Sequence, residues 1–334
     1  MIDLIKKLPK AELHLHIEGT LEPELMLELA QRNSIDIPYS TVEDIEKAYN
    51  FTDLQSFLDI YYEGASVLIK EEDFYSLTWE YLLKCKENNI VHTEIFFDPQ
   101  THTQRGIPFY TVIKGITEAL NDAKDELGIT SQLIMCFLRH LSQEECFKTL
   151  NEAIEFKHDI IGIGLDSSEI GNPPSKFKEV FKKAREEGFK IVAHAGEEAD
   201  CSYIVEALDL LKVERIDHGV QVINSKSLIE RLIKEQIPLT VCPNSNIELK
   251  VFESYKKHNI KELLDLGLNV TVNSDDPAYF KGYLNQNFIN IYKNLNLSKE
   301  DIVKLVRNSF NASFIDEELK KIYLEKVDKI LESF

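Results

Sequence analysis

Two histidines separated by one residue lie in the part of the sequence that is best suited to bind a metal ion. They belong to residues 11–19, AELHLHIEG, which alternate apolar and polar side chains as a β-strand does. Because alternate side chains of a strand point to opposite faces, His14 and His16 share a face with Glu12 and Glu18. Two imidazoles at this spacing can reach one ion, and imidazole is a common zinc ligand. A polar edge strand in contact with water is the alternative for this motif alone.

Histidines and carboxylates recur where further apolar segments end. These ends are residues 166–169 (DSSE), 194–198 (HAGEE), 217–219 (DHG) and 273–277 (NSDDP). Each also has a structural explanation, such as a hydrogen-bonded core histidine or an aspartate that caps a turn. Three histidines and one aspartate at one edge of a sheet would form a mononuclear site with room for a water molecule. That is the form of a catalytic zinc site.

Eight apolar segments alternate with amphipathic segments along the chain. The predicted strands are residues 11–17, 91–98, 132–139, 160–167, 190–196, 214–220, 238–243 and 268–273. The predicted helices between them are residues 109–127, 142–156, 176–187, 203–211, 227–235 and 256–266, the third with Ser175 as its N-cap and Gly188 as its end. This alternation predicts an α/β fold with a parallel sheet, and eight units favour a (β/α)8 TIM-type barrel. A doubly wound open sheet is the alternative.

Two regions fall outside this alternation. Residues 21–90 contain helical segments and many aromatic side chains, and the chain from residue 298 onward is helical in pattern. We expect residues 21–90 to form a helical, cap-like insertion over the mouth of a pocket; a small helical subdomain packed on its own aromatics is the alternative. No linker divides the chain, so residues 1–334 are expected to form a single domain.

Composition limits the partners and the compartment. The formal net charge is −19 without a cluster of Lys and Arg, which argues against nucleic acid and anionic membranes as partners and permits a small neutral substrate. The five cysteines are odd in number and form no CxxC pair, which favours free thiols in a reducing compartment. The first ten residues lack the apolar core of a signal peptide. A cytoplasmic protein is therefore expected.

The motifs HLHIEG, HAGEE, DHG and NSDDP, in this order, resemble the adenosine/adenine deaminase family of zinc hydrolases over almost the whole chain. Segments such as FFDPQTHT and GLDSSE are most similar to its adenine-specific subgroup. The resemblance implies one zinc ion per chain, with His14, His16, His194 and Asp275 as ligands. It also implies a proton donor, a histidine beside the attacking water and a residue that binds the purine, which are Glu197, His218 and Asp276 respectively.

The resemblance implies hydrolysis of adenine to hypoxanthine and ammonia, a step of purine salvage; deamination of the nucleoside adenosine is the alternative. Glu18 stands where the nucleoside enzymes have a shorter Asp, and Ser167 stands where they have Gly. Both side chains would fill space near a sugar on N9. We expect Glu18 or Glu169 to accept a hydrogen bond from the free N9–H.

Other chemistries fit the sequence less well. A cytidine-type deaminase has HxE together with PCxxC; His92 and Glu94 supply the first motif, but the second is absent. A binuclear barrel hydrolase usually has a carbamylated Lys at the end of strand four, and residues 166–169 contain none. A non-catalytic binding module on the same fold is expected to lack a metal ligand or the acid, and neither is missing here.

Overall fold

The computed structural model describes residues 1–334 and contains eight parallel strands, each paired with the next in sequence. They are β1 (Lys10–Glu12), β2 (Ile90–Phe97), β3 (Thr130–Leu138), β4 (Ile160–Asp166), β5 (Lys190–Ala195), β6 (Arg215–His218), β7 (Leu239–Val241) and β8 (Val270–Val272). Their side chains are buried on both faces, as expected for a parallel sheet covered by helices. The predicted α/β barrel is confirmed.

The ring of strands closes between the first and the last. The backbone N–H of Asp275 donates to the His14 carbonyl at 3.1 Å, and the N–H of His16 donates to the Asp275 carbonyl at 3.0 Å. Regular pairing of β1 is shorter than the predicted strand over residues 11–17, because the Leu13 N–H donates to the Asn273 side chain at 2.8 Å. The open doubly wound sheet is thereby excluded.

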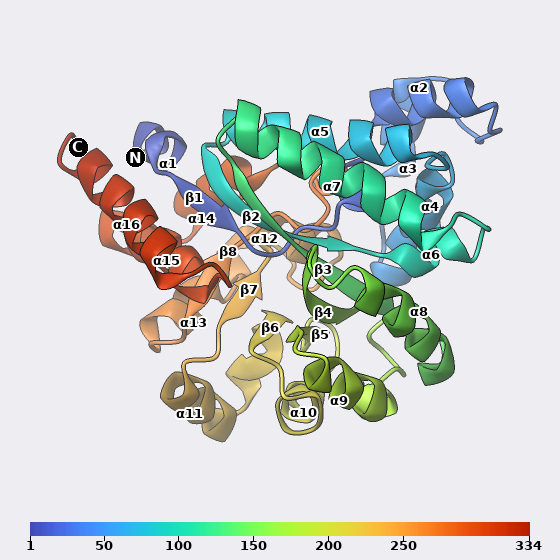
Figure 1. Ribbon diagram of the computed structural model, residues 1–334. Helices are drawn as coiled ribbons and strands as arrows, with labels where there is room; N and C mark the ends of the chain where they lie inside the picture. The colour runs from blue at the N-terminus through green and yellow to red at the C-terminus, as the bar shows by residue number, and fades with distance from the viewer.

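Helices surround the strands (Figure 1). They are α1 (Ile2–Lys7), α2 (Pro23–Asn33), α3 (Val42–Ala48), α4 (Leu54–Ala65), α5 (Glu71–Glu87), α6 (Pro99–Thr103), α7 (Phe109–Glu126), α8 (Gln143–Glu155), α9 (Lys178–Glu186), α10 (Cys201–Glu206), α11 (Lys226–Glu235), α12 (Pro243–Glu248), α13 (Ile260–Asp265), α14 (Leu284–Asn294), α15 (Lys299–Ala312) and α16 (Glu317–Leu331). None combines the length and apolar character needed to cross a bilayer.

Local sequence explains where several helices begin. Ser142 caps α8 by accepting from the Glu145 N–H, and Glu145 bonds back to Ser142. The prediction that Ser175 is an N-cap is wrong. Pro173 and Pro174 start a 3₁₀ turn that includes Ser175, and α9 begins only at Lys178.

The helices α2–α5 stand between β1 and β2, in the region expected to be an insertion. Figure 1 shows α5 and α7 side by side along one flank of the barrel, with α4 near their far end. The two chain termini lie near each other beside α1 and α16, where the Lys7 ammonium lies 5.3 Å from the centre of the Phe334 ring. All five cysteines are free, as predicted.

Candidate metal centre and active site

The segment that follows β1 is fixed between its two neighbouring strands. The Phe96 N–H donates to the Leu15 carbonyl at 2.8 Å, on the β2 side, and the bonds to Asp275 hold the other side. This pairing directs His14 and His16 into the barrel mouth, whereas Leu15 is packed in the apolar core. Glu18 belongs to a 3₁₀ turn, so the expected strand does not extend to it.

Three histidines and one aspartate converge at the barrel mouth. Asp275 Oδ1 lies 3.1 Å from His14 Nε2 and 3.5 Å from His16 Nε2. His194 Nε2 lies 3.2 Å from His16 Nε2. All four side chains are buried. Ligand atoms of His14, His194 and Asp275, together with one of a fourth histidine, His218, all lie within 4.8 Å of one another, and those of His16, Asp275 and Asp276 form a second group at this spacing, which suits a metal ion. The structure therefore contains a cluster that could hold a metal.

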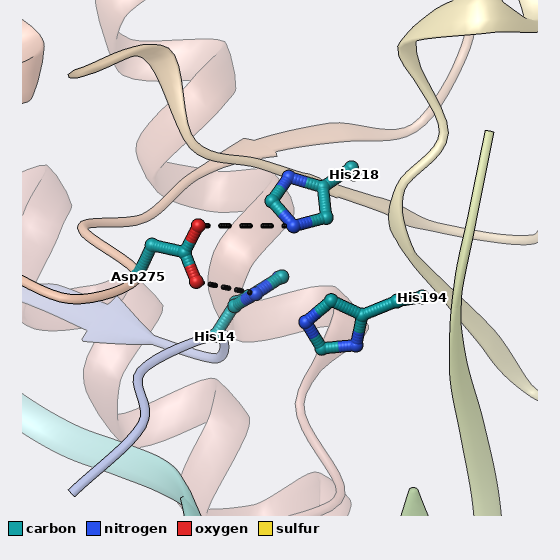
Figure 2. Close-up of side chains that lie close together, drawn as sticks. All are labelled: His14, His194, His218 and Asp275. Atoms are coloured by element: carbon teal, nitrogen blue, oxygen red, sulfur yellow. Dashed lines mark ion pairs between the residues drawn. The ribbon is translucent and has the colours of Figure 1, made fainter. Parts of the chain in front are cut away.

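A fourth histidine lies on the other side of the same carboxylate. Figure 2 shows Asp275 between His14 and His218, with His194 beside them. His218 Nε2 is 3.7 Å from Asp275 Oδ2 and 3.5 Å from Glu197 Oε2. His218 thus faces the second oxygen of Asp275, and it connects the metal-binding cluster with Glu197.

The other ring nitrogen of three histidines faces a second residue. His14 Nδ1 lies 2.9 Å from the Thr240 hydroxyl, which donates to Asp217. His16 Nδ1 lies 3.4 Å from Asp166. The Nδ1 of His194 lies 3.7 Å from Asp217, and neither this atom nor the Nδ1 of His218 has a hydrogen-bond partner. Such contacts orient metal-binding imidazoles, and the sequence analysis did not identify Thr240.

The loop after β5 positions Glu197. The Glu169 carboxylate accepts from four consecutive backbone N–H groups, those of Gly196, Glu197, Glu198 and Ala199, at 2.6 to 3.2 Å. Gly196 has a φ of +71°, and a Cβ there would lie 2.5 Å from Ile204. Glu169 is therefore fully engaged with the loop, and the expectation that it accepts from N9–H is wrong.

Burial sets the protonation of Glu197 and His218. Burial, reinforced by the charge of Asp275, raises the pKa of Glu197 well above its usual range, and Glu197 Oε1 has no hydrogen-bond partner. Burial, opposed by Asp275, lowers the pKa of His218 to about 3. Burial therefore favours the protonated form of Glu197 and the neutral form of the adjacent His218.

Asp275 and Asp276 follow β8 at a turn of the chain, and ligand atoms of Asp275, Asp276 and His16 all lie within 4.8 Å of one another. Asp275 has a φ of +65°, in the left-handed region, so the chain turns at this residue. Asp276 lies against Gly19, where a Cβ would come within 1.9 Å of the Asp276 Oδ1. The absence of a side chain at Gly19 thus makes room for the Asp276 carboxylate, whose Oδ1 has no partner.

These residues surround a cavity of about 390 Å³. Its wall consists of His16, Leu54, Phe57, Leu58, Tyr61, Tyr62, Asp98, Asp166, Ser167, His194, Glu197, His218, Leu249, Asp275 and Asp276. The helix α4 supplies the apolar and aromatic side of this wall. A cluster of polar groups that faces an apolar wall is typical of a small-molecule site.

Two residues that were expected near the sugar position differ in their placement. Glu18 does not line the cavity: its Oε1 accepts from the Asp98 N–H at 3.1 Å and lies 2.9 Å from His102 Nε2. The expectation that Glu18 accepts from N9–H is therefore not supported. Ser167 does line the cavity, and its hydroxyl lies 2.9 Å from the Tyr62 hydroxyl.

The histidine and glutamate of the HxE motif do not belong to this site. His92 lies 2.9 Å from the Thr130 hydroxyl, and Glu94 forms an ion pair with Arg215 at 2.6 Å. Neither His92 nor Glu94 lines the cavity. Their role in the structure is the packing of the barrel interior, as the missing PCxxC motif suggested.

The comparison with known proteins agrees with this geometry. The family model described as adenosine deaminase matches residues 9–330. A protein of Psychrobacter cryohalolentis named adenine deaminase is 72% identical over 98% of this chain and 99% of its own length. The crystal structure of an adenine deaminase from Arthrobacter aurescens superimposes with a TM-score of 0.95 at 46% identity, covering 97% of this chain and 99% of that one. An amidohydrolase from Burkholderia ambifaria with bound Zn shares the fold, with a TM-score of 0.90 at 24% identity over 99% of this chain and 94% of that chain.

Proposed function

The chain belongs to the adenosine deaminase family, and from this membership we propose that it hydrolyses adenine to hypoxanthine and ammonia. The observation that carries the proposal is the arrangement at the barrel mouth. A buried acid, Glu197, lies beside a buried imidazole, His218, which contacts Asp275 of the metal-binding cluster, and all three residues line the cavity. High identity to relatives named adenine deaminase supports the choice of substrate.

One zinc ion per chain is part of the proposal, with His14, His16, His194 and Asp275 as its ligands. The Nε2 atoms of His14 and His16 both face Asp275 Oδ1, whereas His218 faces Oδ2. In addition, the Nδ1 of His14 lies 2.9 Å from the Thr240 hydroxyl, and the Nδ1 of His16 lies 3.4 Å from Asp166, contacts that orient both rings. His14 Nε2 is buried without a hydrogen-bond partner, as a metal-binding atom is in the absence of the ion.

The reaction adds water to C6 of the purine and releases ammonia. A zinc ion supplies Lewis acidity that brings the pKa of water near 7. His218, which is neutral, accepts a proton from the attacking water and holds it in line with C6. Glu197, which is protonated, donates to N1 as C6 becomes tetrahedral. The departing amino group takes up the proton held by His218 and leaves as ammonia, and the C6 hydroxyl returns a proton to Glu197, so that C6 becomes the carbonyl carbon of hypoxanthine.

Asp276 binds N7 in this proposal. Its Oδ1 is unpaired, and its position against Gly19 places it on the cavity wall beside Asp275. Burial, reinforced by Asp275, raises the pKa of Asp276 well above its usual range. A protonated Asp276 carboxyl group donates to N7, which has no hydrogen of its own in the N9–H tautomer of adenine.

The helical region over residues 21–90 acts as a cap in this proposal, within one domain. From α4 the side chains of Leu54, Phe57 and Leu58 face the cavity, opposite the metal-binding cluster. An apolar wall at this position packs on the faces of a flat base and excludes water from the reacting carbon.

The test is kcat/KM for adenine and for adenosine on the purified protein under one condition. We expect adenine to be preferred by about 10⁴ or more, because a site that binds a donor on the substrate rejects the analogue that lacks it. Comparable values, or a preference for adenosine, would overturn the proposed substrate.

A further inference from the structure

Two buried carboxyl groups lie on the cavity wall, and one of them, that of Asp98, has no part in the chemistry described above. Asp98 follows β2 and is 3% exposed, and Asp166 ends β4 and is 2% exposed. Both line the cavity. Burying a polar group without a hydrogen-bond partner is unfavourable, so these two carboxyl groups reduce the stability of the fold.

Most of their oxygen atoms are unpaired. Asp98 Oδ1 and both oxygens of Asp166 have no hydrogen-bond partner, and Asp98 Oδ2 has only a long contact of 3.4 Å with the Tyr61 hydroxyl. The other side chains near this wall are engaged. The Ser167 hydroxyl contacts Tyr62 at 2.9 Å and His140 at 2.8 Å.

The two carboxyl groups differ in what else they contact. Asp166 lies 3.4 Å from the Nδ1 of His16, so it orients a proposed metal ligand. Ligand atoms of His16, Asp98 and Asp166 all lie within 4.8 Å of one another. Asp98 is therefore on the same wall as the cluster, and its Oδ1 remains free to bind a molecule in the cavity.

One hydrogen-bond donor of adenine, the ring N9–H, still has no acceptor in the proposed arrangement. If C6 and N1 face His218 and Glu197, and N7 faces Asp276, then N3 and N9 face the rest of the polar wall. The N9–H is the one ring N–H donor of the base in this tautomer, and it needs an acceptor. Resting on the proposed function, we propose that Asp98 accepts the hydrogen bond from N9–H and thereby selects the free base over N9-substituted purines.

The selectivity follows from what happens when the donor is absent. A methyl group or a sugar on N9 removes the N–H and leaves the Asp98 oxygen buried without a partner, which is costly. The same substituent also occupies the space beside Asp98 and Asp166. Adenine alone satisfies the acceptor, so Asp98 is a specificity-determining residue.

The experiment compares adenine with 9-methyladenine, which lacks the N–H but adds only one carbon. For each enzyme variant, the ratio of the two kcat/KM values is measured on one preparation, so that the fraction of active enzyme cancels. In the wild type we expect a ratio of about 10⁴ or more. In Asp98→Ala, we expect the ratio to fall at least about 100-fold, because the unpaired acceptor is gone and space is created.

Asp98→Asn is the second variant, in case the alanine variant fails to fold. Asparagine keeps one side-chain oxygen that can accept but replaces the other with an NH2 group, so we expect a ratio between those of the wild type and Asp98→Ala. Binding of the product provides a readout without turnover. Titration calorimetry should show that hypoxanthine loses affinity in Asp98→Ala while 9-methylhypoxanthine gains it.

Glu12→Gln is the matched control. Glu12 is a buried carboxylate outside the cavity that bonds to Ser274 and Tyr81, so its substitution should leave the ratio unchanged. A ratio in Asp98→Ala equal to that of the wild type would overturn the role of Asp98 while the adenine activity stands. A wild type that does not deaminate adenine would overturn the proposed function itself.

Discussion

Two buried glutamates of the barrel, Glu94 and Glu197, differ in their partners. Glu94, on β2, has both oxygens paired: Oε2 with Arg215 at 2.6 Å, and Oε1 with the Phe314 N–H and His92. Burial acts to raise the pKa of Glu94, but Arg215 and His92 outweigh it, so the pKa lies below its usual range. Glu94 is therefore ionised and fixed.

Glu197 is buried to a similar extent without a cation. Its backbone is held by Glu169, but its Oε1 is unpaired, and burial together with Asp275 raises its pKa. The comparison shows how one barrel produces both a structural and a reactive carboxyl group. A buried charge persists where the fold supplies an opposite charge, and a buried acid stays protonated where it does not.

The same contrast separates two zones of the molecule. Around Glu94 and Arg215, the polar groups are largely satisfied by the chain itself. At the barrel mouth, unpaired buried atoms gather on His14, Glu197, Asp166 and Asp276. Unpaired groups that remain in a folded protein indicate a ligand that satisfies them, here a metal ion and a substrate.

Removal of the metal should have the largest effect. Because the unpaired nitrogen and oxygen atoms at the barrel mouth need a cation, a chelator should abolish deamination, and added zinc should restore it. Elemental analysis should give about one zinc ion per chain. Zinc at 100 times its Kd should also stabilise the fold by about 2.7 kcal/mol in thermal unfolding. Two tightly bound metal ions, both needed for activity, would contradict the mononuclear site.

Substitution of the unpaired glutamate should have the next largest effect. Glu197→Gln retains the size of the side chain but cannot donate the proton, so kcat should fall by about 10²–10⁴ with zinc still bound. Steady-state kinetics and elemental analysis on the same preparation provide the measurement. His218→Ala should likewise reduce kcat more than zinc content. Near wild-type turnover in Glu197→Gln would remove this residue from the mechanism.

Substitution of the paired glutamate should change stability and leave the chemistry intact. Glu94→Gln leaves Arg215 buried without its counter-charge, and the free energy of unfolding should fall by about 3–5 kcal/mol. Denaturant unfolding measures this change, while kcat of the folded enzyme should stay near the wild-type value. A matched surface control is Glu230→Gln, which removes an exposed pair with Lys226 and should change stability by about 0.5 kcal/mol or less.

The pH dependence of stability tests whether the charge on Glu94 causes the effect of Glu94→Gln. The folded pKa of Glu94 is below its unfolded value of about 4.3, so its contribution to stability is present above that value. As the pH falls from about 5 through the folded pKa, the unfolded chain binds the proton first and the contribution is lost. The stability difference between the wild type and Glu94→Gln should therefore shrink over this range; a constant difference would show that the charge on Glu94 is not its cause.

Local patterns along the chain were enough to predict the alternation of strands and helices and the residues that meet at the barrel mouth. Apolar runs bounded by Gly and polar residues are local signals, and parallel strands bring their carboxyl ends to one edge. For this reason the convergence of His14, His16, His194 and Asp275 could be predicted from their positions at strand ends. The boundaries were less well predicted, as at Ser175, because the proline pair before it starts a 3₁₀ turn.

Which carboxylates lack hydrogen-bond partners depends on the three-dimensional fold and could not be predicted from local patterns. Glu169 and Asp98 both follow apolar strands, and nothing in their local sequence distinguishes them. Four backbone N–H groups of a distant loop engage Glu169, whereas Asp98 Oδ1 faces the cavity without a partner. Hydrogen bonds between residues far apart in sequence depend on how the chain folds back on itself, so a pattern of residue types along one segment does not contain them.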